Sequence, residues 1–301
     1  MTTMEYHNPV LLHPTVDGLN IKPDGVYVDV TFGGGGHSRE IMSRLGENGK
    51  LFAFDQDLDA LKNAIDDERF TLINENFRFI KRFLRFHGIK QVDGILADLG
   101  VSSHQFDVAE RGFSTRFDAE LDMRMNQKGD ISAYHVVNEY DEQDIARVLF
   151  DYGELKNARA MANVSVTARK DEEIKNSDEL KKVLAKFLPG HKSNKILAQI
   201  YQAIRIEVNQ EMDVLKEFLE QSLEILKPGG RLSVISYHSL EDRLVKRFVK
   251  NGMFEGEPER DFFGNFEVPF KTIEKLIVPS EEEIAINNRA RSAKLRVAEK
   301  I

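Results

Sequence analysis

The fold is decided by the stretch Val26-Tyr27-Val28-Asp29-Val30-Thr31-Phe32-Gly33-Gly34-Gly35-Gly36-His37-Ser38. Its β-branched and apolar beginning predicts a strand, and four consecutive glycines follow directly. Glycine has no Cβ, so its backbone adopts positive φ and lets a ligand approach the main chain closely. A helix that begins after the glycines would offer unpaired N–H groups to that ligand. The stretch therefore predicts a strand that leads into the loop of a nucleotide-like cofactor site.

Strand and helix patterns alternate from this stretch onward. Strands are predicted near 26–31, 50–54, 70–74 and 92–97, with amphipathic segments after the first three. Such alternation indicates an α/β fold with a parallel, doubly wound sheet. Ligands bind beyond the carboxyl ends of the strands in this architecture. The residues at those ends are Gly33 to His37, Asp55, Asn76-Phe77 and Asp98.

The alternation stops after about Phe106, and helical segments are predicted near 141–150, 153–169 and 177–187. An inserted helical domain explains this gap. The sheet is expected to resume with a helix that the turn Lys227-Pro228-Gly229-Gly230 closes, and with a strand over 231–236. The predicted organisation is therefore a discontinuous domain of residues 1–105 and 200–301, with an inserted helical, substrate-recognition domain over 106–199.

Composition excludes several classes of protein. With 301 residues and 41% hydrophobic side chains, the chain can fill a substantial core. The absence of cysteine excludes disulfides, thiolate nucleophiles and cysteine-based metal sites, and the eight histidines form no cluster with metal-ligand spacing, so no metal site is predicted. No apolar run is long enough to span a bilayer and the start of the chain has no signal core, so we expect a cytoplasmic protein without a membrane partner.

The net charge of −8 disfavours general wrapping of nucleic acid, yet two basic segments stand out. One comprises Arg78, Lys81, Arg82, Arg85 and Lys90, for which a solvated helix face is an equal explanation. The other lies in what is predicted to be a short C-terminal tail, with Arg289, Arg291, Lys294, Arg296 and Lys300. The second segment is the better candidate for contact with RNA phosphates.

The glycine run fits S-adenosylmethionine better than a dinucleotide. A dinucleotide fingerprint requires a third glycine where this chain has Ser38 or Arg39, depending on the alignment. S-adenosylmethionine has no pyrophosphate and tolerates a looser glycine run. Asp55, about twenty residues later, suits the ribose hydroxyls of either cofactor, although Asp55 or Asp57 could instead cap a helix over 57–66.

Two further strand ends carry candidate residues. Phe77 could place its ring against an adenine, although a lone phenylalanine is as often a core residue. Asp98 opens the loop Asp98-Leu99-Gly100-Val101-Ser102-Ser103-His104-Gln105, and it suits methyl transfer to an amino group that must be held and must lose a proton. A turn-forming aspartate is the alternative.

Taken in order, these segments resemble the MraW family of bacterial 16S rRNA (cytosine-N4)-methyltransferases over nearly the full length. The matching runs are His7 to Leu12, Thr31 to Ser38, Asp93 to Ser103, Glu110 to Ser114, Leu121 to Met125, Gln202 to Asn209, Ser236 to Arg243 and Arg289 to Arg296. The resemblance implies a class I methyltransferase sheet, Rossmann-like, with an inserted helical domain. It also implies S-adenosylmethionine as cofactor and methylation of the exocyclic N4 of a cytidine in the decoding region of 16S rRNA, within the small ribosomal subunit.

By resemblance, contacts to the cofactor are assigned to Gly35, Gly36, His37, Asp55, Phe77, Asp98 and Gln105. Gly33 is also expected to contact the cofactor, because it lies at the end of the predicted strand. For the chemistry, Asp98 is the first candidate to accept from the amine, and the backbone carbonyls of Leu99 to Ser102 compete with it. If Asp98 touches the cofactor, its role is instead to position the methionine amino group.

Tyr237 is expected to stack on the flipped cytosine, and His238 to bond the base or a phosphate, unless His238 caps a helix over 239–250. The residues expected to contact RNA are Arg111, Arg124, Arg289, Arg291 and Arg296. The run from Leu121 to Met125 could equally be core packing with one ion pair.

Three alternatives remain. A nicotinamide oxidoreductase would explain the sheet, the glycines and Asp55, but not the missing third glycine. A non-catalytic RNA-binding assembly factor would explain the basic C-terminal segment, but not the Asp98 loop. A methyltransferase with another nucleic-acid or amine acceptor would share every cofactor residue.

Overall fold

The computed structural model describes residues 9–260, 262–263 and 267–301. His7 and Asn8 of the first matching run lie outside the described residues, as do residues 261 and 264–266. The chain divides into two compact units, which we call the sheet unit (1–100 and 212–301) and the insert unit (101–211). The predicted boundary at 105/106 lies five residues after the first boundary of the units, but the one at 199/200 lies twelve residues before the second and falls inside a helix over 193–209. The substrate-recognition role of the insert stays a prediction.

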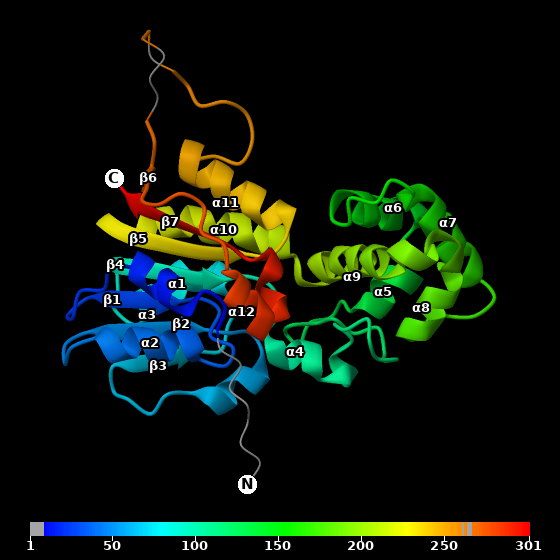
Figure 1. Cartoon of the computed structure of the whole chain (residues 1–301), viewed down its shortest axis with the longest axis horizontal. Coiled ribbons are helices and arrows are strands. Elements are labelled where there is room, and N and C mark those ends of the chain that lie inside the picture. The colour runs from blue at the N-terminus through cyan, green and yellow to red at the C-terminus, as the bar shows by residue number, and fades with distance from the viewer. Residues whose placement is uncertain (1–8, 261, 264–266) are drawn as a thin grey trace. The chain divides into compact units, whose positions relative to one another are not determined.

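The sheet unit is built on seven strands, coloured from blue to red in Figure 1. They are β1 (Val26–Asp29), β2 (Lys50–Phe54), β3 (Phe70–Ile73), β4 (Val92–Asp98), β5 (Leu226–Ser236), β6 (Phe270–Thr272) and β7 (Lys294–Lys300). Their order is β3-β2-β1-β4-β5-β7-β6, and the first five pair in parallel as the alternation predicts. Strands β1 and β4 are neighbours although the chain passes through β2 and β3 between them, which makes this the point where the strand order reverses.

The C-terminal basic segment is not a tail, and that expectation is wrong. Strand β7 lies between β5 and β6 and pairs with both in antiparallel fashion, so the sheet is mixed. The side chains of β7 alternate between the two faces of the sheet. Leu295 and Val297 are buried, while the side chains of Lys294 and Arg296 point to the other face and pair with Asp242. The lysines and arginines therefore occupy the more open face of a strand.

The predicted turn at 227–230 lies inside β5, which begins at Leu226. Val92 pairs with Leu226, but the next register pair joins Gly94 to Arg231. The extra residues on β5 therefore form an irregularity in the strand pairing instead of a connection outside it. Helix α10 (Glu211–Ile225) ends directly before the strand.

Helices cover both faces of the sheet. Alternate strand residues such as Val28, Phe52 and Ile95 form one core with α3 (Ile80–Phe86), α10 and α11 (Ser239–Asn251). Their neighbours Tyr27 and Leu51 face a second core. The helices of this second face are α1 (Leu12–Gly18) and α2 (Gly36–Arg44). This alternation follows from the two-residue period of a strand, and it makes a three-layer unit.

The insert unit is helical, as predicted. Its helices are α4 (Ser103–Asp107), α5 (Ala133–Asn138), α6 (Glu142–Asp151), α7 (Ala158–Ala168), α8 (Ser177–Val183) and α9 (Ser193–Asn209). Helix α7 begins five residues later than predicted, because Glu154 adopts a left-handed conformation with φ of 52° and breaks the helical pattern. No helix in the described part of the chain has both the length and the apolar character needed to cross a membrane.

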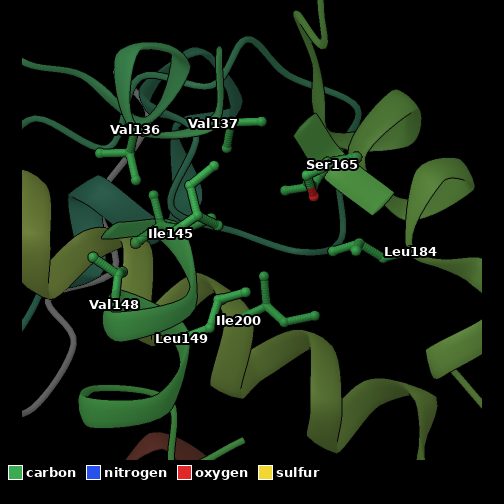
Figure 2. A pocket seen from close by; sticks show the side chains of 10 residues that line it. Val136, Val137, Ile145, Val148, Leu149, Ser165, Leu184 and Ile200 are labelled. Atoms are coloured by element: carbon green, nitrogen blue, oxygen red, sulfur yellow. The ribbon is translucent and has the colours of Figure 1, made fainter. Parts of the chain in front are cut away.

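A small pocket lies inside the insert unit, and it is apolar (Figure 2). Its lining includes Val136, Val148 and Ile200, with Ser165 as the polar exception. The hydroxyl of Ser165 donates to the carbonyl of Met161 on its own helix, so it offers nothing to a ligand. The pocket belongs to the core of this unit and is unsuited to a charged cofactor.

Candidate active site

The glycine loop leaves β1 and enters α2 at the carboxyl edge of the sheet. Gly33 and Gly35 have φ of 49° and 75°, in the left-handed region that glycine adopts without strain. A Cβ at Gly36 would lie 2.1 Å from Cγ of Pro9, whereas a Cβ at Gly34 would meet nothing within 4 Å. The loop is therefore closed against the N-terminal segment on one side and open at Gly34.

Asp55 follows β2 and ties this loop to the next strand. Its carboxylate accepts from the N–H groups of Gly33 at 2.8 Å and Asp57 at 2.9 Å. The helix cap is Asp57, which accepts from the N–H of Asp59, so Asp55 does not have that role. Burial raises the pKa of Asp55 to about 6, despite these hydrogen bonds. A carboxylate has lone pairs beyond the two used here, so the ribose contact predicted for Asp55 is compatible with the site.

Thr31 connects two more carboxylates, Asp29 at the end of β1 and Asp98 at the end of β4. Its backbone N–H donates to Asp29 at 3.1 Å, and its hydroxyl oxygen accepts from the N–H of Asp98 at 2.7 Å. Asp29 is fully buried, accepts from the Ser38 hydroxyl at 2.7 Å, and has its pKa raised to about 6 by burial. Asp29, Asp55 and Asp98 therefore lie at the carboxyl ends of three adjacent strands, at one edge of the sheet.

Asp98 is the most strongly perturbed of the three. Its side chain keeps 23% of its surface exposed, but surrounding protein atoms remove much of its hydration and raise its pKa to about 7. The hydrogen bond from Tyr237 lowers this pKa, while the charges of Asp29 and Glu241 raise it further. A site where nearby carboxylates repel one another favours a cationic ligand, because a positive charge would stabilise all of them.

His37 lies between Asp98 and the N-terminal segment. Its Nε2 lies 3.1 Å from the carbonyl oxygen of Val10, and burial lowers its pKa to about 4. The ring is therefore neutral at physiological pH, with Nε2 as the donor and Nδ1 as a free acceptor. Nδ1 lies 3.9 Å from Oδ2 of Asp98, too far for a direct hydrogen bond. His37 thus closes one side of the site without adding charge.

Tyr237 and His238 follow β5 at the same edge. The Tyr237 hydroxyl donates to Oδ1 of Asp98 at 2.8 Å. His238 is the N-cap of α11, and Glu241 completes a capping box by accepting from the N–H groups of Tyr237 and His238. The capping alternative for His238 is therefore confirmed, and its contact with the base or a phosphate stays a prediction.

Phe77 lies four residues after the end of β3, on the far side of β2 from the glycine loop. Its ring is half-buried and packs edge-on against Phe218 of α10, with centroids 5.3 Å apart. Asn76 fixes this turn by accepting from the N–H of Arg78 and donating to Gln56. The ring is held at one edge and keeps an accessible surface, as a stacking contact with adenine requires.

Ser102 and Gln105 belong to the insert unit, where they begin α4. The Ser102 side chain accepts from the N–H of Gln105, and the Gln105 side chain accepts from the N–H of Ser102. This reciprocal pair is a capping box, and it explains the spacing of the two residues. Their predicted roles in catalysis and in cofactor binding stay predictions.

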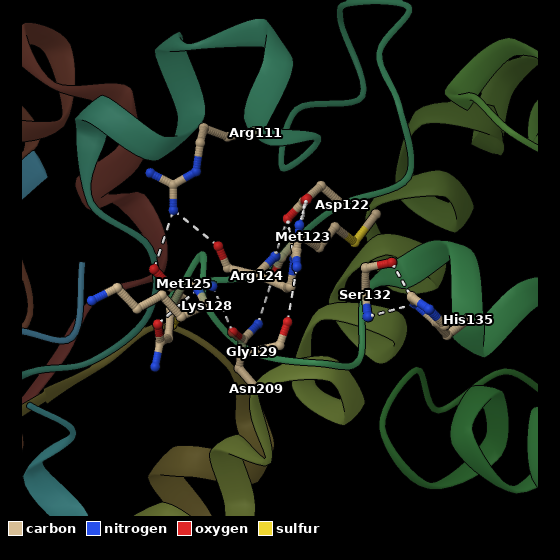
Figure 3. A network of polar contacts seen from close by, with 11 residues as sticks. Arg111, Asp122, Met123, Arg124, Met125, Lys128, Gly129, Ser132, His135 and Asn209 are labelled. Carbon is tan, nitrogen blue, oxygen red and sulfur yellow. Dashed lines mark hydrogen bonds and ion pairs between the residues drawn. The ribbon is translucent and has the colours of Figure 1, made fainter. Parts of the chain in front are cut away.

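Arg111 and Arg124 hold the insert loop together (Figure 3). The guanidinium of Arg111 is buried and donates to the carbonyls of Arg124 and Met125, while Arg124 forms an ion pair with Asp122 at 2.6 Å. Asn209 of α9 forms two hydrogen bonds with the same loop: it accepts from the N–H of Met125 and donates to the carbonyl of Met123. The core-packing alternative for this run is confirmed. These contacts favour a structural role for both arginines, and their RNA contacts stay predictions.

The three C-terminal arginines differ in their surroundings. Arg291 is exposed, whereas Arg296 lies on β7 and pairs with Asp242 at 2.8 Å. Arg289 lies in the short turn before β7, which Asn287 caps. In the other basic segment, the partly buried side chains of Arg78 and Lys81 pair with Glu217 and Glu224 of α10, so these two charges are compensated within the protein.

Sequence reasoning missed Asp29, Thr31 and Glu241 as members of the site. Asp29 carries a readable signal, because an acidic residue inside an apolar strand must have partners. Thr31 has none, since its importance comes from the hydrogen bond that it accepts from the N–H of Asp98, 67 positions away. Glu241 has a local signal, because it stands three residues after the cap residue His238, which is the spacing of a capping box.

Comparison with known proteins identifies the family. A sequence model of the MraW methylase family matches residues 4–301. The chain belongs to the MraW methylase family. Relatives named "Ribosomal RNA small subunit methyltransferase H" include that of Flavobacterium johnsoniae, 83% identical over 100% of this chain and 99% of the relative. Another, from Bacteroides thetaiotaomicron, is 56% identical over 99% of this chain and 98% of the relative.

Among solved structures, an rRNA methylase from Streptococcus thermophilus matches 96% of this chain and 95% of its own, at 13% identity and a TM-score of 0.44. The fold class rests instead on the strand order, which is that of the class I methyltransferase sheet with its antiparallel seventh strand. As an MraW family member, the chain is an S-adenosylmethionine-dependent methyltransferase. The expected fold, enzyme class and cofactor are thereby confirmed, and the nicotinamide oxidoreductase is excluded.

Asp98 should destabilise the cofactor-free protein as pH rises. In the folded chain Asp98 keeps its proton up to about pH 7, whereas its ordinary pKa is 3.8, so the folded state is progressively disfavoured between these values. We expect Asp98→Asn to raise the melting temperature at about pH 8 and to raise it clearly less at about pH 5, where only part of this cost has developed. The matched control Asp24→Asn, at an exposed position before β1, should change neither value. An equal effect of Asp98→Asn at both pH values would contradict the assignment.

Proposed function

We propose that this enzyme transfers the methyl group of S-adenosylmethionine to the exocyclic N4 of a cytidine in the decoding region of 16S rRNA. The observation that carries the proposal is the family match over residues 4–301, together with 83% identity to a relative named as a small-subunit rRNA methyltransferase. An acceptor within the small ribosomal subunit and a cytoplasmic location follow from that substrate. They are part of the proposal.

The residues of the sheet unit fit this cofactor. The glycine loop allows a close approach of the ligand to the backbone at Gly34, and Asp55 suits the two ribose hydroxyls. Phe77 suits the adenine ring. Asp98 and Asp29 supply negative charge for a ligand that carries both a sulfonium and an ammonium group. When bound, S-adenosylmethionine supplies an electrophilic methyl group.

The amine needs help from the protein, because the lone pair of cytosine N4 is delocalised into the ring. An oxygen that accepts a hydrogen bond from the amine draws it out of conjugation as the new N–C bond forms and the S–C bond breaks. The amine must then lose one proton. Asp98, with a pKa of about 7, is suited to accept it, and the carbonyls of Leu99 to Ser102 are suited to hold the amine. In the other role, Asp98 binds the methionine ammonium.

Access of the base requires that it leave its stack, and an aromatic surface would hold it. Tyr237 is half-buried beside Asp98, so one part of its ring is available for that contact. His238 lies next to it at the start of α11. Both residues follow β5 at the edge of the sheet where the residues predicted to bind the cofactor lie.

The direct test supplies labelled S-adenosylmethionine with 16S rRNA or 30S subunits that lack the modification, followed by nucleoside mass spectrometry. We expect label in N4-methylcytidine, and loss of at least 100-fold in rate for Asp98→Ala, a typical effect of removing a general base. Asp24→Ala, at an exposed position, is the control. Label in another nucleoside would move the proposal to that acceptor. RNA binding without any transfer would favour an assembly factor.

Arg291 provides a test of the RNA surface. Because its side chain is exposed, Arg291→Ala should weaken RNA binding and lower the slope of log affinity against log salt by about 1. The affinity for S-adenosylmethionine should be unchanged. Lys50→Ala removes an exposed charge at the start of β2, at the opposite edge of the sheet, and should leave the slope unaltered. An unchanged slope for Arg291→Ala would remove this residue from the interface.

A further inference from the structure

Tyr237 makes a contact that its expected role as a stacking platform does not use. Its hydroxyl donates to Oδ1 of Asp98 at 2.8 Å, across the gap between the ends of β5 and β4. Among the described residues, this phenol is the one hydrogen-bond donor to the Asp98 carboxylate. The Asp98 side chain is therefore oriented from a single direction.

We propose that Tyr237 is a positioning residue that commits Oδ1 of Asp98 to its phenol and so leaves Oδ2 directed to the cationic methyl donor. This inference rests on the proposed function and deepens it. It gives the hydroxyl of Tyr237 a role distinct from that of its ring.

The Tyr237 ring is itself held in place. It packs against a core that includes Leu11, Ile235 and Leu295, and its Cδ2 lies 3.6 Å from where a Cβ on Gly100 would be. Gly100 has φ of 99°, so the turn after Asp98 passes closely under the ring. The backbone N–H of Tyr237 donates to Glu241 of α11 at 2.9 Å. Ring and backbone are thus fixed independently, and the hydroxyl has little freedom to leave Asp98.

The groups around Asp98 show why a single donor matters. From α2, His37 presents a neutral ring whose Nδ1 has no proton to give, because Nε2 donates to Val10. From β1 and α11, Asp29 and Glu241 act on Asp98 as negative charges. The charge of Glu283 of α12 (Glu281–Ile286) likewise raises the pKa of Tyr237. Of these groups, the Tyr237 phenol therefore stabilises the ionised form of Asp98. That ionised form is the one that binds a cation.

The phenol remains a donor across the accessible pH range. Burial and the adjacent Asp98 raise the pKa of Tyr237 well above its ordinary value, so it keeps its proton. Removing the hydroxyl removes an interaction that lowers the pKa of Asp98. In Tyr237→Phe, Asp98 should then be protonated over a wider range of pH. The cofactor should therefore lose the ionised carboxylate as its binding partner, and this loss should be largest near pH 7.

The experiment measures the dissociation constant of S-adenosylmethionine by calorimetry, which needs no RNA. For Tyr237→Phe we expect it to rise about tenfold at pH 7 and about threefold at pH 9, since a hydrogen bond to a charged group is lost. Tyr27→Phe is the matched control. It removes another buried tyrosine hydroxyl of the sheet unit, which accepts from the N–H of Lys22, and it should change neither value.

Two further variants make the result specific. In an Asp98→Asn background, Tyr237→Phe should have no additional effect, because the phenol acts through the carboxylate. Replacement of Tyr237 by 3,5-difluorotyrosine keeps the ring and gives a more acidic donor, so it should tighten binding at pH 7. This substitution tests the inference even if Tyr237→Phe does not fold.

An unchanged dissociation constant for Tyr237→Phe would overturn the inference, as would an equal loss at both pH values or in the Asp98→Asn background. A stacking role alone predicts that Tyr237→Phe is silent and that Tyr237→Leu raises the KM for RNA. If cofactor binding responds as expected but no N4-methylcytidine forms, the acceptor is wrong and the positioning role stands.

Discussion

Three carboxylates at the carboxyl ends of adjacent parallel strands are the constraint on which the rest of the site depends. Asp29 and Asp98 are the last residues of β1 and β4, Asp55 follows β2, and burial raises the pKa of each well above that of a free aspartate. Burying acids costs stability unless a ligand compensates them. The protein therefore keeps a site that is electrostatically strained without its ligand and suited to a cation, which is the charge that S-adenosylmethionine carries.

The topology explains why these acids meet. The strand order reverses between β1 and β4, so the glycine loop after β1 and the Asp98 turn after β4 leave the sheet side by side. Thr31 then joins the two carboxyl ends through one hydroxyl and one N–H. Segments from both ends of the chain complete the edge: Val10 binds His37, and the N–H of Leu11 donates to Glu283 of α12 at 2.7 Å. The class I sheet thus builds the site from chain segments that are distant in sequence.

Sequence reasoning recovered what local patterns encode. The first four strands, the position of the glycine loop and the strand-end places of Asp55 and Asp98 follow from strand periodicity. Their roles toward the cofactor stay predictions from the rule that ligands bind at strand ends. Strand β7 was missed because basic side chains occupy most of its more exposed positions and only three of its residues are buried. The pattern therefore resembled a basic C-terminal tail. The bond from Tyr237 to Asp98 was also missed, since it joins residues 139 positions apart. Arg111 and Arg124 show the reverse case: their charge suggested RNA, but carbonyl and carboxylate groups of the same loop bind them.

Cofactor binding should release protons from the buried carboxylates, and calorimetry tests this most directly. S-adenosylmethionine is titrated into the protein at about pH 6.5, in buffers with different ionisation enthalpies, since the raised pKa values of the three acids lie at about 6 to 7. A bound cation lowers those pKa values, so protons should be released and the observed heat should vary with the buffer. S-adenosylhomocysteine, which lacks the sulfonium charge, should release fewer protons. Identical heats in all buffers would contradict the claim that the buried carboxylates form the cation site.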